Sequence, residues 1–355
     1  MRGRARRIPR PVNDMKGAAT IGPLPSPDKI RVAIIGVGAF GRNHARVYRQ
    51  LEQQGEVLLA GVVDTNAERA AAVAQEFGTR VLSSVESLRG RVDAASVAVP
   101  TVEHLAVARV LMESGIDVLI EKPLAPSLAE ADELIRIAES TGRIAQVGHL
   151  ERFNPAVRAT LPLITRPMFF EVHRLSVFTP RSLDIDVVLD LMIHDLDIVL
   201  AFVQSPVKEV RAVGLPIITP RVDIANVRME FASGCVANFT ASRVSTERVR
   251  KLRFFQPQQY ISIDYGRQDV LVFTLDSGGS TAPVGQPTGF SPFPGVTVNR
   301  PATTPEEPLL AELRSFVEAV RRRSRPLVPL EDGRRALAVA LEIVAAIKEH
   351  AQRVM

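Results

Sequence analysis

Three side chains that can hold or exchange a proton occur in short motifs of this sequence: Lys122, Asp190 and His194. Asp190 and His194 are four residues apart, so on a helix they would lie on one face within contact distance. A carboxylate beside a histidine orients the ring, and a lysine can polarise an oxygen or share in proton transfer. Together these groups suit oxidation of a secondary alcohol. On spacing alone, the pair could instead be a surface ion pair, and Lys122 a solvated lysine.

A glycine motif earlier in the chain indicates where a dinucleotide would bind. Gly36, Gly38 and Gly41 follow the apolar segment 32–35 and precede a helix-compatible stretch. Gly36 can make the tight turn, Gly38 lets the backbone approach the phosphates, and Gly41 lets the helix pack on the strand. The helix N-terminus would then face the pyrophosphate. Ala39 and Phe40, which lie between Gly38 and Gly41, are also expected at the cofactor. An ordinary strand-to-helix turn is the alternative.

An acidic residue follows this motif at the distance expected for a contact with the adenosine ribose. Asp64 ends the apolar segment 57–63, about twenty residues past the glycines. A carboxylate there can accept hydrogen bonds from the ribose hydroxyls and would repel a 2′-phosphate. Thr65 and Asn66 follow it directly, rather than an arginine. The sequence therefore predicts NAD rather than NADP as the cofactor.

The segment that carries these motifs alternates strands and helices, as in a parallel sheet covered on both faces. Strands are predicted at 32–35, 57–63, 80–81, 94–99, 117–120 and 144–147. Helices are predicted at 41–54, 67–77, 102–114 and 127–140. Ser127 and Glu130 would form a capping box at the start of the last helix. Residues 29–150 are thus predicted to be an NAD-binding α/β domain, a Rossmann-type doubly wound parallel sheet.

Three motifs fall at predicted strand ends, where open parallel sheets bind their ligands. Two of them, 100–104 and 121–123, contain further residues expected near the cofactor: Pro100, Thr101, His104, Glu121 and Lys122. The third, 148–155, opens the second domain. His104 could simply begin a helix. No metal site is predicted, because the acidic residues around His194 lack a second histidine at ligand spacing.

From residue 151 onward the pattern changes to strands in succession, typical of an α+β domain with a mostly antiparallel sheet. Strands are predicted at 169–178, 207–214, 225–231, 236–241, 252–265 and 270–275. Helices are predicted at 186–203, 309–323 and 332–352. Residues 277–308, rich in glycine, proline, serine and threonine, are predicted to be a long loop. The second domain is expected to span 151–355.

Charge and composition argue against several other classes of protein. The chain has 355 residues and a net charge of +5. Residues 1–28 hold six basic and two acidic side chains, so +4 of this charge belongs to a tail that we expect to be disordered. Nucleic-acid binding is therefore unexpected, although an arm at 1–16 that binds polyanions is an alternative. No segment has the roughly 18 to 20 apolar residues of a membrane helix. Cys235, the single cysteine, fits a reducing cytoplasm.

The order of these motifs resembles that of the Gfo/Idh/MocA oxidoreductase family over residues 30–350. The matching landmarks are Gly36-x-Gly38-x-x-Gly41, Asp64, Pro100-Thr101-x-x-His104, Glu121-Lys122-Pro123 and Asp190-x-x-x-His194. The resemblance implies an NAD-dependent oxidoreductase whose second domain is built on an open sheet. It also implies a homodimer or homotetramer formed through that sheet, and a meeting of Lys122, Asp190 and His194 at the nicotinamide.

Within this family, the segments 148–155, 190–197 and 241–251 look most like those of members that oxidise C3 of UDP-N-acetylglucosamine. This similarity implies a 3-oxo product that an aminotransferase of the lipid A precursor pathway then converts. The side chains expected to bind the UDP-sugar are Lys122, His149, Arg152, Asn154, Asp190, His194 and Arg243. The two phosphates could be held by the cations Arg152, Arg243, Arg248 and Lys251.

Two alternatives concern the activity itself. The same chemistry could act on inositol or on another free or nucleotide sugar. A sensor or scaffold could bind NAD without turnover. The joint presence of Lys122, Asp190 and His194 argues against the second alternative, because a protein that only binds NAD needs none of them.

Overall fold

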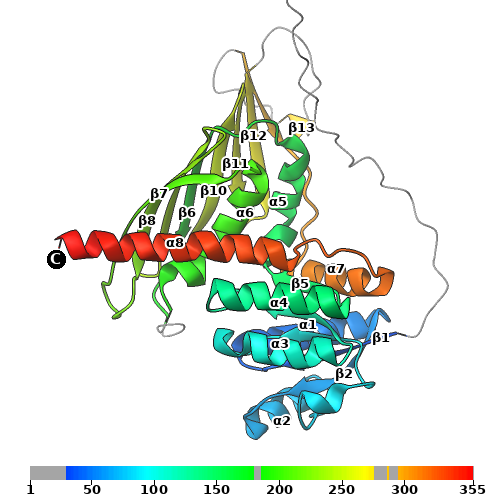
Figure 1. The fold of residues 1–355 in the computed structure, drawn as a ribbon. Helices are drawn as coiled ribbons and strands as arrows, with labels where there is room; N and C mark the ends of the chain where they lie inside the picture. The colour runs from blue at the N-terminus through cyan, green and yellow to red at the C-terminus, as the bar shows by residue number, and fades with distance from the viewer. Residues whose placement is uncertain (1–28, 180–184, 276–285, 288–294, 355) are drawn as a thin grey trace, which may run out of the picture.

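The computed structural model describes residues 29–179, 185–275, 286–287 and 295–354 of the chain. These residues form two β-sheets, with the small sheet at the bottom of Figure 1 and the large sheet above it. The predicted disordered tail, 1–28, lies outside the described residues. No described helix is both long and apolar enough to cross a membrane.

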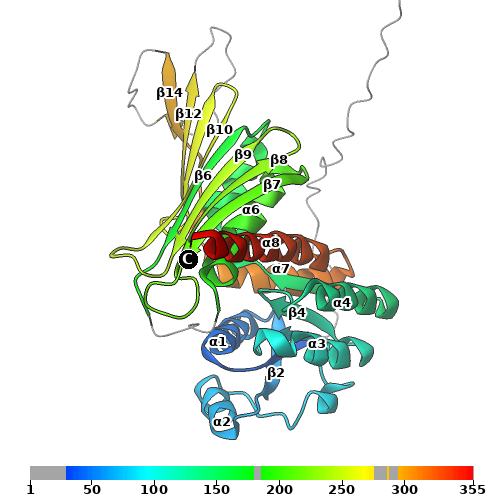
Figure 2. The same ribbon diagram turned by 60° about the vertical axis from the view of Figure 1, so that its left-hand side comes forward.

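The small sheet contains five parallel strands in the order β2-β1-β3-β4-β5. Their bounds are β1 Ile30–Ile35, β2 Val57–Val63, β3 Ala94–Val97, β4 Asp117–Glu121 and β5 Ala145–Gly148. The strands are mostly apolar because both faces of the sheet are covered. Helices from α1 to α4 pack on it in two cores (Figure 2). They are α1 Ala39–Gln53, α2 Ala67–Glu76, α3 His104–Glu113 and α4 Leu128–Thr141. The predicted Rossmann-type sheet is confirmed.

Two local predictions for this domain have different outcomes. The N-cap half of the capping box is confirmed, because the Ser127 hydroxyl accepts a hydrogen bond from the Glu130 N–H at 3.3 Å; the Glu130 carboxylate accepts from the Ser127 hydroxyl, also at 3.3 Å. The short strand at 80–81 is wrong, since a single bridge joins Val81 to Val62. Short 3₁₀ turns also occur along the chain, at Glu86–Leu88, Thr101–Glu103, Leu150–Phe153 and Leu161–Leu163.

The large sheet has nine strands in the order β13-β14-β12-β11-β10-β6-β9-β8-β7. Their bounds are β6 Phe169–Leu175, β7 Val207–Leu215, β8 Ile224–Phe231, β9 Val236–Ser242, β10 Val249–Gln256, β11 Gln259–Asp264, β12 Asp269–Leu275, β13 Gln286–Pro287 and β14 Val296–Arg300. Strands β6 and β9 pair in parallel, and the other pairs are antiparallel. This confirms the predicted mostly antiparallel sheet.

Two boundaries in this sheet differ from the prediction. The segment 252–265 is a hairpin rather than one strand, because the chain reverses at Gln258, whose φ is 63°. The expected loop 277–308 contains β14, which pairs with β12. The remainder of that loop at 276–285 and 288–294 lies outside the described residues.

Helices cover one face of the large sheet, and the other face carries none of the described helices (Figure 2). The covering helices are α5 Pro155–Thr160, α6 Ile193–Val203 and α8 Leu330–Val354. The helix predicted at 186–203 begins instead with a π-helical turn, Val188–Met192, which runs into α6. This turn carries Asp190, one of the three candidate proton-handling residues.

The C-terminal helices return to the small sheet. Helix α7, Pro308–Arg322, packs in the same core as β1 and α1, through Leu313 and Phe316. The segment before α8 pairs with the edge strand β5, where the Val147 N–H donates to the Val328 carbonyl at 2.9 Å. The predicted assignment of all of 151–355 to the second domain therefore does not hold for α7.

Helix α7 buries a carboxyl group in that core. Glu312 is fully buried, and neither side-chain oxygen has a hydrogen-bond partner among the described residues. Burial, with the negative charge of Glu121 nearby, raises the pKa of Glu312 well above its ordinary value. The folded protein therefore favours the protonated form of Glu312, because the buried site disfavours the charge.

We predict that Glu312→Gln makes the protein more stable at pH 8 than the native sequence. Because the pKa of Glu312 is raised in the folded state, its contribution to the free energy of unfolding is complete below pH 4.5, the ordinary pKa of the group. That stability is lost as pH rises toward the folded-state pKa, by up to about 1.4 kcal/mol per pH unit. Urea unfolding from pH 5 to pH 8 measures the difference. Glu318→Gln, at a partly exposed site on α7, is the control; an advantage of Glu312→Gln that stays constant with pH would contradict the prediction.

Candidate active site

The glycine motif forms the turn between β1 and α1. Gly36 has a φ of +82°, and a Cβ on Gly41 would lie 1.8 Å from the Gly36 carbonyl oxygen, so the fold itself requires both glycines. A Cβ on Gly38 would meet nothing within 4 Å. Gly38 therefore leaves open space at the N-terminus of α1, where Ala39 and Phe40 are exposed. This open helix N-terminus fits a pyrophosphate, as the sequence predicts.

Asp64 lies beside this turn and is held by several donors. Its carboxylate accepts hydrogen bonds from the Val37 and Asn66 N–H groups, both at 2.8 Å. The guanidinium of Arg69 also donates to both carboxylate oxygens, at 2.8 and 3.1 Å. Burial would raise the pKa of Asp64, but these hydrogen bonds, chiefly from Arg69, hold it below its ordinary value. Sequence reasoning missed Arg69, because it reaches Asp64 from the first turn of α2.

The motif after β3 holds two loops together. His104 is buried, and its ring nitrogens lie 3.1 Å from the Val99 carbonyl oxygen and 3.2 Å from that of Leu124. Burial lowers the pKa of this imidazole. His104 thus braces the loop after β3 against the loop after β4, whereas Pro100 and Thr101 at the strand end are at least partly exposed.

The two residues at the end of β4 face different parts of the protein. Oε1 of Glu121 lies 2.9 Å from Nε2 of His44 in α1, and Oε2 accepts from the Lys122 N–H at 3.3 Å. Lys122 reaches toward the second domain, where its ammonium donates to the main-chain oxygen of Asp190 at 2.7 Å. The ammonium also lies 3.5 Å from the Asp190 carboxylate. Glu121 therefore anchors the strand end, and Lys122 is directed to the π-helical turn.

His194 lies in the first turn of α6, directly after that π-helical turn. Its Nδ1 is buried and has no hydrogen-bond partner among the described residues, so the predicted contact with Asp190 is not formed through this nitrogen. Burial lowers the pKa of His194 well below its ordinary value, and the charges of Lys122 and Arg174 add to the effect. A neutral imidazole of this kind can accept a proton.

A second histidine lies close to this group. Both ring nitrogens of His149 are buried without a hydrogen-bond partner among the described residues. Burial lowers its pKa; the negative charge of Asp197 opposes that effect, while the positive charges of Arg152 and Lys122 reinforce it. The structure thus brings Lys122, Asp190, His194 and His149 into one region between the two sheets.

A buried ionic network fixes the position of α6. The Arg174 guanidinium on β6 donates to both oxygens of Asp195, at 2.6 and 3.0 Å, and to Glu151 at 3.1 Å. The Asn154 side chain donates to Glu151 at 3.1 Å and accepts from the Ala156 N–H at the start of α5. Asn154 was predicted to bind substrate, but its amide is engaged within the protein. Sequence reasoning missed Arg174. A signal was available, because Arg174 falls on the same face of β6 as the buried apolar residues of that strand.

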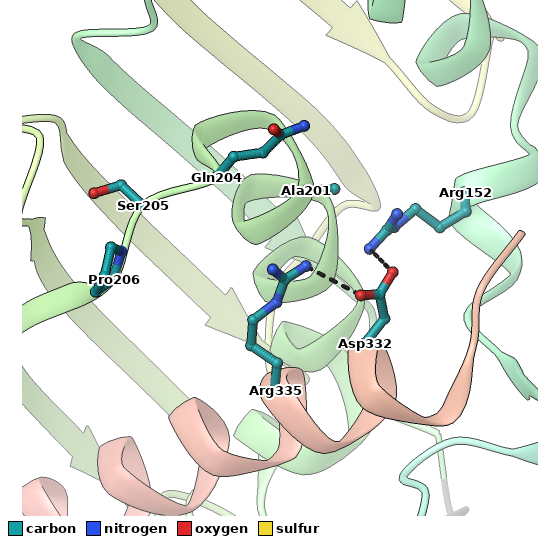
Figure 3. Close-up of a pocket in the computed structure, with 7 residues that line it drawn as sticks. All are labelled: Arg152, Ala201, Gln204, Ser205, Pro206, Asp332 and Arg335. Atoms are coloured by element: carbon teal, nitrogen blue, oxygen red, sulfur yellow. Dashed lines mark hydrogen bonds and ion pairs between the residues drawn. The ribbon is translucent and has the colours of Figure 1, made fainter. Parts of the chain in front are cut away.

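The two arginines predicted to hold the substrate are also paired within the protein. Arg152 donates to Asp197 at 2.6 and 2.8 Å and to Asp332 at 3.3 Å. It lines a surface pocket of about 540 Å³ in which Arg152 and Arg335 both point at Asp332 (Figure 3). Arg243 is buried and donates to the Ile185 carbonyl. These contacts argue against Arg152 and Arg243 as substrate ligands, because their guanidinium groups already stabilise the fold.

No group of metal-ligating side chains is found within the described part of the chain. The geometry instead combines an open helix N-terminus with a lysine and a neutral histidine near the ends of parallel strands. Such an arrangement can bind a dinucleotide and move a proton next to it.

Comparison with known families gives two matches. Residues 30–149 match an oxidoreductase family with an NAD-binding Rossmann fold, and residues 168–260 match the GFO/IDH/MocA C-terminal domain. The expected cofactor, NAD, therefore agrees with both the fold and the family description.

Individual proteins were also similar. The UDP-N-acetylglucosamine 3-dehydrogenase of Acidithiobacillus ferrooxidans is 38% identical over 91% of this chain and 99% of that protein. Its solved structure has a TM-score of 0.82, covering 90% of this chain and 98% of the other. The inositol 2-dehydrogenase of Acidothermus cellulolyticus is 31% identical over 52% of this chain and 56% of that protein. The scyllo-inositol dehydrogenase of Lactobacillus casei, 17% identical with a TM-score of 0.73 over 91% and 98%, shares the fold.

We predict that Gly38→Ala weakens NAD binding by at least about tenfold without lowering stability. The new Cβ meets no protein atom, yet it occupies the space into which the phosphates fit. Gly41→Ala serves as the contrast, since its Cβ would collide with the Gly36 carbonyl and should destabilise the fold. NAD titration calorimetry and thermal unfolding of both variants measure these effects. Unchanged NAD affinity in Gly38→Ala would contradict the assignment.

Proposed function

Since the chain belongs to the GFO/IDH/MocA family of NAD-binding oxidoreductases, we propose that it oxidises a secondary alcohol of a sugar, at C3 of UDP-N-acetylglucosamine. The substrate is supported by the near full-length similarity to a UDP-N-acetylglucosamine 3-dehydrogenase. The observation that carries the chemistry is the contact of Lys122 with Asp190 beside the neutral imidazole of His194.

The proposed mechanism assigns one task to each of these side chains. The turn at Gly36 and Gly38 would hold NAD, which would supply a hydride acceptor for the carbinol carbon. His194 takes the hydroxyl proton, because its lowered pKa keeps the ring neutral. Lys122, held by the Asp190 carbonyl, stabilises the negative charge that develops on the same oxygen. Asp190 thereby positions the ammonium rather than the imidazole.

The product of this reaction would be a 3-oxo nucleotide sugar. A ketone at C3 is a substrate for amino-group transfer, so an aminotransferase of a lipid A precursor pathway is the proposed next enzyme. The coupled removal of the ketone would also draw the oxidation forward.

We expect NADH to appear when the purified chain is mixed with NAD, UDP-N-acetylglucosamine, a 3-aminotransferase and glutamate. The absorbance of NADH measures the rate. Parallel reactions with inositol and free N-acetylglucosamine test the substrate alternatives, and NADH formed only from these would overturn the nucleotide-sugar proposal. Tight NAD binding without turnover on any alcohol would instead favour a sensor or scaffold.

Within the same assay, Lys122→Met and His194→Asn should each lower turnover by about 10²- to 10⁴-fold, the usual contribution of proton transfer and charge stabilisation. NAD affinity should be unchanged. The matched control is His173→Asn, because His173 lies on the face of β6 that the helices do not cover. This variant should turn over like the native protein. Native turnover in both of the first two variants would remove them from the proposed mechanism.

We also propose that copies of the chain associate through the open face of the large sheet, as a homodimer or homotetramer. A row of aromatic rings lies there with centroids 4.9 to 5.8 Å apart, in the order Phe169, Phe255, Tyr260 and Phe273. Phe255 is 39% exposed. Exposed contiguous apolar surface of this kind is characteristic of protein interfaces.

Phe255→Glu is predicted to shift the protein to a smaller assembly, because a carboxylate would be buried against the partner's rings. Light scattering coupled to size-exclusion chromatography measures the mass. Leu327→Glu, at a site 53% exposed in the segment before α8, is the control and should keep the native mass. An unchanged mass for Phe255→Glu would locate the interface elsewhere.

A further inference from the structure

Arg250 occupies an unusual place on the helix-covered face of the large sheet. Leu252 and Phe254, the next residues of β10 with the same parity, are fully buried in the core under the helices. Arg250 lies opposite Arg174 in the neighbouring strand and therefore shares that face. Unlike Leu252, Phe254 and Arg174, Arg250 is exposed. The core thus ends at this point of the strand, and the side chain lies where solvent or a ligand can reach it.

The position of Arg250 is close to the candidate catalytic group. Its charge is one of those that lower the pKa of His194, after burial and the charges of Lys122, Arg174 and His149. Burial and the charge of Arg174 lower the pKa of Arg250, while the charges of Glu151 and Asp195 oppose that effect. Arg250 is therefore within electrostatic reach of both the imidazole and the buried network beneath it.

Three neighbouring cations, Arg174, Lys251 and Arg253, differ from Arg250 in having carboxylate partners. Arg174 makes ion pairs with both Asp195 and Glu151. On the opposite face of β10, Lys251 and Arg253 lie 4.0 and 3.8 Å from carboxylates of adjacent strands. Within the described part of the chain, Arg250 makes no side-chain hydrogen bond or ion pair. Its guanidinium hydrogen-bond donors are therefore available to an anionic ligand.

We infer that Arg250 binds the diphosphate of the nucleotide-sugar substrate and so selects for anionic sugars. This inference rests on the proposed function. It gives Arg250 the role that the sequence assigned to Arg152 and Arg243, both of which are engaged within the protein. A guanidinium can donate two parallel hydrogen bonds to phosphate oxygens, whereas a neutral polyol such as inositol offers no charge to it.

The test compares Arg250→Met, Arg250→Lys and the control Lys348→Met, at an exposed cation on α8, in the full-length protein with NAD present. Free UDP is the probe, and calorimetry measures its Kd. Arg250→Met is expected to raise the Kd of UDP and the KM of UDP-N-acetylglucosamine by about 10- to 100-fold, the loss typical of a charge-assisted contact. The turnover number and NAD affinity should stay near native, and Arg250→Lys should recover part of the loss.

The outcomes separate this inference from the proposed function. If the native protein binds UDP and Arg250→Met binds it equally well, the inference fails and the proposed function stands. If the native protein does not bind UDP and oxidises only neutral sugars, both fail. A loss in Arg250→Met that Lys348→Met shares equally would show a general effect of surface charge and would also overturn the inference. Arg250 makes no contact whose loss should unfold the protein, and thermal unfolding of each variant verifies this.

Discussion

The arrangement of the site depends on the buried guanidinium of Arg174. It joins Glu151, which follows the last strand of the small sheet, to Asp195 on α6, while Arg174 itself belongs to the large sheet. Three ionised groups out of water are tolerable only when they are paired, and removing one partner from such a network typically costs about 3–5 kcal/mol. Because Asp195 adjoins His194, the same ion pairs that join the two sheets also set where the imidazole lies.

The end of β4 shows how a strand distributes two polar groups between two tasks. Glu121 is the last residue of β4, and Lys122 follows it. Glu121 turns inward to His44 and the small sheet, and Lys122 turns outward to Asp190. The Glu121 carboxylate thus stabilises the cofactor domain, while the Lys122 ammonium lies between the two domains. Two adjacent residues thus have different roles: Glu121 is structural, and Lys122 is placed for the reaction.

Much of the fold follows from local patterns, and much of the site does not. Continuous apolar runs predicted the parallel strands, and alternation predicted the second sheet. The hairpin at Gln258 was missed because no glycine marks its turn, and the strand at 80–81 failed because two residues form only one bridge. Arg152 and Arg243 were assigned to the substrate because their partners, Asp197 and the Ile185 carbonyl, lie more than 40 residues away in sequence. Contacts at that separation leave no trace in a local motif.

The return of α7 and α8 to the small sheet has a consequence for how the chain is made. The segment before α8 covers the edge strand β5, and α7 closes the core over β1 and α1. The cofactor domain is therefore translated early but lacks these parts until residues 308–330 have left the ribosome. Until then an apolar face and a strand edge stay uncovered, which is the condition under which nascent chains aggregate or engage chaperones.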